Sequence, residues 1–162
     1  MTTRREVLKW GAMGTLASMA PPLALAAATS PVSGFTSRRP AKGDRCFTSM
    51  AVETAIVETK KRIGDPELAW LFENCLPNSL DTTVKLGTAD GKPDTFVITG
   101  DIDAMWLRDS SAQVWPYLAF LKEDKPLAQL VQGVIHRQAR CILLDPYANA
   151  FMPDPHSQPL SW

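Results

Sequence analysis

The chain has 162 residues, of which 45% are hydrophobic and 21% charged, values typical of soluble globular proteins. Seventeen Lys and Arg residues balance seventeen Asp and Glu residues, so the formal net charge at pH 7 is +0. Because no basic excess is present to attract a phosphate backbone, the composition argues against nucleic acid as a partner. The prolines and glycines follow no period, which favours a single domain or part of one.

The first 28 residues have the organisation of an export signal. A basic start that contains the pair Arg4 and Arg5 precedes an apolar stretch over residues 10–25, which ends in small residues. The arginine pair resembles a twin-arginine signal, which exports folded proteins. A membrane-spanning or amphipathic helix is the alternative, but two adjacent prolines shorten the apolar stretch below the roughly 20 residues of a bilayer span. We therefore expect a periplasmic or extracellular protein that meets the membrane only during export.

A flexible leader is predicted over residues 29–45, which are rich in Ser, Pro, Gly and Arg and have no hydrophobic period. The folded domain is expected to occupy residues 46–162. It contains Cys46, Cys75 and Cys141, an odd number for an oxidising compartment. At most one disulfide can form among them. Helical surroundings favour buried, inert thiols, and the sequence leaves both interpretations open.

Hydrophobic spacing predicts four helices, at residues 47–63, 66–76, 110–122 and 126–144. The second helix begins with Asp65 and Pro66, an N-cap followed by proline at the first helical position. We expect this helix to bury one apolar face, formed by Leu68, Ala69, Leu71, Phe72 and Leu76.

A β-hairpin is predicted between the second and third helices. Extended segments at residues 80–86 and 95–99 flank a turn that contains Asp90-Gly91, a pair typical of two-residue hairpin turns. Residues 101–106 are expected to form a loop or tight turn. A second loop is predicted for residues 145–162, which hold several prolines.

The densest cluster of reactive side chains lies in residues 99–117. It contains Asp101, Asp103, Asp109, Arg108 and Trp106. Carboxylates and arginine can each hold two adjacent sugar hydroxyls, and a flat aromatic ring covers the apolar face of a sugar. The alternative is a salt bridge that pins a loop onto a helix, with the tryptophan as a core anchor. Taken alone, the residues fit both.

A second candidate segment follows the last predicted helix. Tyr147 and Asn149 offer a hydroxyl and an amide to a polyol, although composition alone slightly favours the alternative, an Asx turn that stops the helix. His136 and His156 have too few suitable neighbours for a metal site. Neither a phosphate-binding loop nor a dinucleotide fingerprint nor a nucleophile elbow occurs. We expect no metal and no cofactor.

Three segments, PNSLDTTV, FVITGDIDAMWLRDSSAQVWPYL and DPYANAF, resemble the family 125 glycoside hydrolases in their order and spacing. The resemblance covers about residues 46–156. It implies a mainly helical fold, the N-terminal part of an (α/α)6 barrel with a small β-hairpin. It also implies metal-independent, inverting removal of terminal α-1,6-linked mannose from a mannose-containing glycan. The residues that match the family as a substrate-binding wall are Asp101, Asp103, Trp106, Arg108, Asp109, Tyr147 and Asn149.

The same resemblance implies that the catalytic acid and base lie beyond Trp162. An inverting glycosidase needs these two carboxyl groups roughly 6.5–9.5 Å apart, on either side of the scissile bond. A twelve-helix barrel, at roughly 11 residues per helix plus loops, needs well over ~180 residues. We therefore expect a truncated barrel that is inactive alone. The alternative is a non-catalytic carbohydrate-binding or interaction fragment.

Overall fold

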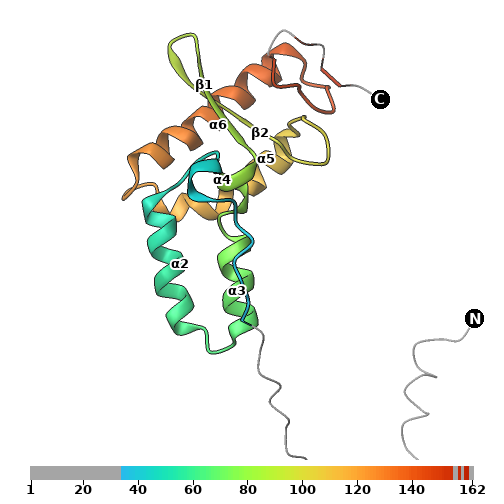
Figure 1. Cartoon of the computed structure of the whole chain (residues 1–162). Coiled ribbons are helices and arrows are strands. Elements are labelled where there is room, and N and C mark those ends of the chain that lie inside the picture. The colour runs from blue at the N-terminus through green and yellow to red at the C-terminus, as the bar shows by residue number, and fades with distance from the viewer. Residues whose placement is uncertain (1–33, 155–156, 158, 161–162) are drawn as a thin grey trace, which may run out of the picture. The chain divides into compact units, whose positions relative to one another are not determined.

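The protein is mainly helical with one antiparallel β-hairpin (Figure 1). The computed structural model describes residues 34–154, 157 and 159–160; the expected export signal and the start of the leader lie outside this range. Within the described residues, no helix combines the length and hydropathy needed to cross a membrane. The elements are η1 (Lys42–Asp44), α2 (Met50–Arg62), α3 (Pro66–Cys75), α4 (Asn78–Thr82), β1 (Val84–Ala89), β2 (Lys92–Val97), α5 (Leu107–Val114), η2 (Trp115–Phe120) and α6 (Lys125–Leu144).

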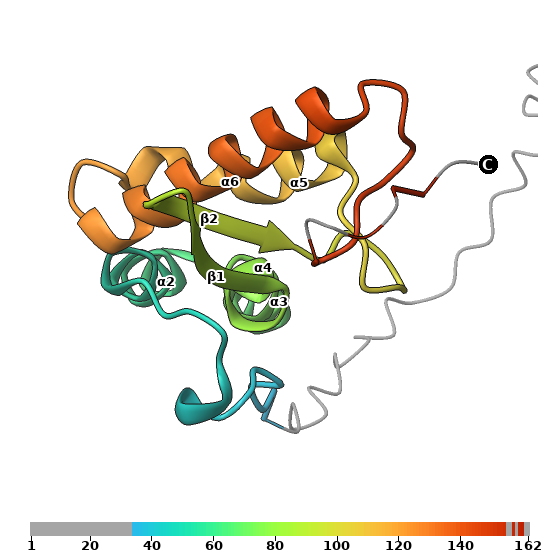
Figure 2. The same cartoon turned by 90° about the horizontal axis from the view of Figure 1, so that it is seen from above.

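The hairpin turn forms at the predicted pair. Asp90 and Gly91 have φ values of 54° and 71°, the left-handed conformation that a two-residue hairpin turn requires at both positions. The strands pair from Val84 opposite Val97 to the turn. Figure 2 shows α5 and α6 on one side of the hairpin and α2, α3 and α4 on the other. The hairpin is therefore the middle layer of a small three-layer arrangement.

The long helix α6 packs directly on β2. At Gly133 an added Cβ would lie 2.3 Å from the Thr95 hydroxyl oxygen, so only glycine permits this approach. One turn later, Arg137 donates to both carboxylate oxygens of Asp94, at 2.9 and 2.5 Å, and its guanidinium lies 5.4 Å from the centre of the Phe96 ring. Both members of the ion pair are more than nine-tenths buried, so each needs the other to offset its lost hydration.

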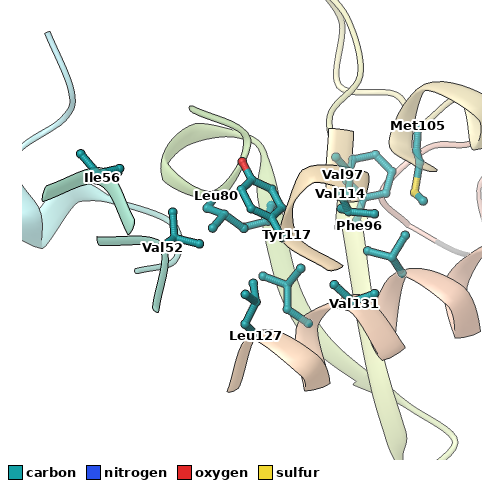
Figure 3. Close-up of a cluster of buried hydrophobic side chains, with 13 residues drawn as sticks. Val52, Ile56, Leu80, Phe96, Val97, Met105, Val114, Tyr117, Leu127 and Val131 are labelled. Carbon is teal, nitrogen blue, oxygen red and sulfur yellow. The ribbon is translucent and has the colours of Figure 1, made fainter. Parts of the chain in front are cut away.

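A single hydrophobic core links the layers (Figure 3). Tyr117 lies at its centre beside Leu80, and its hydroxyl donates to the Leu76 carbonyl at 2.6 Å. Burial raises the pKa of Tyr117 because the ionised phenolate would be poorly solvated there. The buried core residues are Val52, Ile56, Leu80, Val84, Phe96, Val97, Met105, Val114, Tyr117, Leu127, Leu130, Val131 and Val134.

Two helix N-termini are joined through their caps. Ser49 caps α2 and donates its hydroxyl to the Asp124 carboxylate at 2.6 Å, while Asp124 caps α6 by accepting from the Leu127 amide at 2.9 Å. Burial alone would raise the pKa of Asp124, but these hydrogen bonds outweigh it and lower the pKa. The ionised carboxylate therefore holds the start of α2 against the start of α6.

The second part of the expected leader is docked on the domain. Arg39 donates to Asp81 at 2.7 Å and forms a second ion pair with Glu53; its hydrogen bond lowers the pKa of Glu53 despite partial burial. The Trp70 indole donates to the Thr36 carbonyl at 2.7 Å. The sequence predicted a flexible leader up to residue 45, whereas these long-range contacts fix residues 36–45. Composition alone does not reveal such contacts.

Three local predictions differ from the structure. Residues 78–82 form α4 rather than the start of a strand, because this turn buries Leu80 in the core. The third predicted helix begins earlier, at Leu107, and becomes the 3-10 helix η2 where Pro116 cannot supply a backbone donor. The apolar face of α3 is buried only in part: Phe72 and Leu76 pack against the core, whereas Leu68 and Leu71 are 53% and 41% exposed.

We predict that Gly133→Ala lowers the free energy of unfolding by about 1–3 kcal/mol, because the added methyl group overlaps Thr95. Helix propensity alone would predict a gain of about 1 kcal/mol, so the sign of the change is diagnostic. Urea denaturation of the chain measures it. Gly43→Ala is the control, since its Cβ would meet no atom within 4 Å. A stabilised Gly133→Ala variant would contradict the close packing of α6 on β2.

Candidate functional site

A backbone bridge brings the two predicted site segments together. The Met105 amide donates to the Phe151 carbonyl at 2.8 Å, and the Phe151 amide donates to the Met105 carbonyl at 3.0 Å. In Figure 2 the red C-terminal segment passes the yellow loop that precedes α5. Both bridging side chains are buried. The loop that contains Met105 and the segment that contains Phe151, far apart in the sequence, therefore lie side by side.

The first loop is closed by a threonine that the sequence analysis did not single out. The Thr99 hydroxyl accepts from the Trp106 amide at 2.9 Å and lies 3.3 Å from the Ala104 carbonyl, to which it donates. Trp106 is half-buried and occupies the position just before α5. Its ring is thus neither a core anchor nor fully exposed. Its backbone is held by both the loop and the helix, since the Trp106 carbonyl accepts from the Ser110 amide of α5 at 2.9 Å.

The carboxylates of the loop point to an open surface. Asp101 and Asp103 are exposed, and Asp103 accepts from the Lys85 ammonium group of β1 at 2.8 Å. Their neighbour Ile102 is 43% exposed. An exposed ion pair of this kind contributes little to stability, so the carboxylates stay available for a polar ligand.

Arg108 and Asp109 lie in the first turn of α5. Their side chains are 86% and 39% exposed, and they form an ion pair with each other at 3.3 Å. In the described part of the chain, Arg108 forms no other ion pair. The arginine therefore does not pin the loop to a distant element, as the structural alternative required.

The second segment combines both interpretations that the sequence left open. The Tyr147 amide donates to the Asp145 carboxylate at 2.9 Å, which is an Asx turn at the end of α6. That turn leaves the Tyr147 side chain 94% exposed. Asn149 is also exposed, while its backbone amide donates to the Leu160 carbonyl at 2.8 Å. The turn stops the helix and presents the two polar side chains to solvent.

The best-formed hollow of the described surface lies elsewhere. It encloses about 190 Å³, and none of the seven predicted site residues lines it. Its walls are Arg137, Arg140, Cys141, Leu144, Phe151, Met152, Asp154 and Ser157. Arg137 and Arg140 both bind Asp94, so this one carboxylate offsets one of their two positive charges. The predicted residues therefore lie outside this hollow.

Metal and thiol chemistry find little support in the described residues. Over that part of the chain, no three His, Cys, Asp or Glu side chains are grouped so that they could hold a metal ion. Cys141 is buried, and burial raises the pKa of its thiol, which makes it a poor nucleophile. Cys46 and Cys75 are exposed free thiols, so the prediction of buried thiols is confirmed only for Cys141.

Carboxylates, an arginine and a tryptophan on one open wall of a helical scaffold are typical of carbohydrate-binding surfaces in glycoside hydrolases. The model of one such family, the metal-independent α-mannosidases (GH125), matches residues 65–161. The chain belongs to this family.

Two relatives agree with this assignment. The meiotically up-regulated gene 157 protein of Schizosaccharomyces pombe is 50% identical over 121 residues, which are 74% of this chain and 24% of the yeast protein. A solved metal-independent α-mannosidase from Streptococcus pneumoniae, in a non-productive complex with α-1,6-mannobiose, is 44% identical with a TM-score of 0.60. That match covers 67% of this chain and 25% of the pneumococcal one. The chain thus spans about a quarter of the length of either relative.

We predict that Arg108→Ala changes the free energy of unfolding by less than about 0.5 kcal/mol, because its ion pair is exposed and local. Arg137→Ala is the contrasting variant and should cost about 3–5 kcal/mol, since it leaves Asp94 buried without its main partner. Urea denaturation of both variants measures the two changes in the free energy of unfolding. A loss above about 1 kcal/mol for Arg108→Ala would show that this residue is structural.

Proposed function

We propose that the chain forms the mannose-binding wall of an exo-acting α-1,6-mannosidase with an inverting, metal-independent mechanism. The observation that carries the proposal is the Met105–Phe151 bridge, which brings the backbones of the two segments side by side. The α-1,6-mannobiose complex of the pneumococcal relative supports this choice of sugar and linkage. In this proposal the described helices are part of an (α/α)6 barrel.

Each exposed side chain has a role that its chemistry suits. Asp101, Asp103 and Asp109 accept hydrogen bonds from mannose hydroxyls, and Arg108 donates to two adjacent oxygens. Trp106 packs against the apolar face of the sugar ring. Tyr147 and Asn149 extend the wall from the second segment. Such contacts accelerate hydrolysis only if they strengthen as the ring distorts toward the transition state.

The hydrolytic step needs two further carboxyl groups. An acid must protonate the leaving oxygen while a base activates water on the opposite face of the sugar. We assign neither role to the seven wall residues, and we propose that both groups come from other segments of a complete family member. A second candidate function is carbohydrate binding without hydrolysis, which the seven wall residues would suit because none of them is assigned to the hydrolytic step.

We predict that the chain binds α-1,6-mannobiose saturably but does not cleave it, with or without chelator. Calorimetric titration measures binding, and chromatography of released mannose measures turnover. Arg108→Ala should weaken binding about tenfold, the loss of roughly one charge-assisted hydrogen bond. The glucose disaccharide with the same α-1,6 linkage is the control ligand. Turnover that survives chelator would show a complete site in this chain, and absence of binding would contradict the wall itself.

We also propose that residues 1–28 export the protein by the twin-arginine route. Replacing both arginines, Arg4→Lys with Arg5→Lys, should retain the precursor in the cytoplasm, because this route depends on the arginine pair. Cell fractionation followed by immunoblotting measures the distribution. Lys9→Arg is the matched control, since it changes a basic residue outside the pair. Continued export of the double variant would contradict the proposal.

A further inference from the structure

Gln138 on α6 contacts the first turn of α5, which contains the two wall residues Arg108 and Asp109. The Gln138 side-chain nitrogen lies 3.1 Å from the Leu107 carbonyl, 2.9 Å from the Ser110 hydroxyl and 2.9 Å from the Ser111 hydroxyl. Leu107 directly precedes Arg108 and Asp109. The amide group has two hydrogens for three acceptors, so the acceptors share them.

The three acceptors form one connected unit. Ser110 and Ser111 each donate their hydroxyl to the Leu107 carbonyl at 2.9 Å, so this oxygen is the shared acceptor of the turn. Ser110 is fully buried, which excludes water as a substitute partner on that side. Replacing the amide therefore removes the donor to the buried Ser110 hydroxyl, while the Leu107 carbonyl keeps the two serine hydroxyls as donors.

We infer that Gln138 is a positioning residue for the mannose-binding wall: it fixes the first turn of α5 and with it the directions of Arg108 and Asp109. The two wall residues are exposed and pair only weakly with each other, so they do not fix this turn themselves. The first turn of α5 and the long helix α6 are joined here by the side-chain amide of Gln138. The inference has two parts. The positioning part, that Gln138 fixes the turn, rests on the hydrogen bonds alone; the sugar-binding part, that this turn matters for mannose, rests on the proposed function.

The decisive variant is Gln138→Glu, which keeps the shape of the side chain but removes its two donors. Gln132→Glu on the same helix is the matched control. Gln132 is exposed, and its replacement by glutamate introduces the same negative charge. Gln138→Lys restores a donor with enough length to reach the turn and serves as the rescue variant.

Hydrogen exchange followed by mass spectrometry reports the positioning part. We expect the amides of residues 107–114 to exchange about tenfold faster in Gln138→Glu, at wild-type rate in Gln132→Glu, and close to wild-type rate in Gln138→Lys. Unchanged exchange in Gln138→Glu would overturn the inference.

Titration with α-1,6-mannobiose reports the sugar-binding part. We expect the dissociation constant to rise about five- to tenfold in Gln138→Glu, to recover in Gln138→Lys, and to stay unchanged in Gln132→Glu. Faster exchange with unchanged affinity would overturn the role of Gln138 in binding. If the wild-type chain binds no mannobiose, the proposed function fails, while the exchange experiment still decides whether Gln138 holds the turn.

Discussion

The close packing of α6 on β2 is the contact on which the rest of the structure depends. Gly133 lets the helix approach Thr95, and one turn later the buried pair of Arg137 and Asp94 prevents the helix from sliding along the strand. Arg137 also donates to the Pro153 carbonyl at 3.0 Å, so the same guanidinium holds the segment that follows the wall. A charge this deeply buried tolerates only one arrangement, because any shift leaves it unpaired.

The position of α6 determines the geometry of the wall. The Gln138 side chain of α6 contacts the first turn of α5. The C-terminus of α6 leads into the segment that contains Tyr147, and the same segment pairs with Met105 through Phe151. Five of the seven proposed wall residues are exposed, and Trp106 and Asp109 are partly buried. In this account most of the proposed surface can be altered without unfolding the domain.

Much of this arrangement could be predicted from sequence. The 3.6-residue period of α6 and the Asp90-Gly91 turn are strong local signals, and both predictions are confirmed. The seven wall residues came from a family resemblance, and the structure joins their two segments without testing their roles. The Met105–Phe151 bridge and the contacts of Gln138 left no signal, because they depend on backbone groups and on tertiary packing. On α3 the prediction of burial is wrong for Leu68 and Leu71, although Phe72 and Leu76 do pack against the core, because periodicity shows which face is apolar and not what covers it.

The central claim is that residues 101–109 and 147–149 form one mannose-binding surface. Chemical-shift mapping by two-dimensional NMR during titration with α-1,6-mannobiose tests it most directly. The account predicts concentration-dependent shifts at Trp106, Arg108 and Asp109 together with Tyr147 and Asn149, all fitting one dissociation constant. Shifts confined to the hollow between α6 and residues 151–157, or to only one of the two segments, would contradict it.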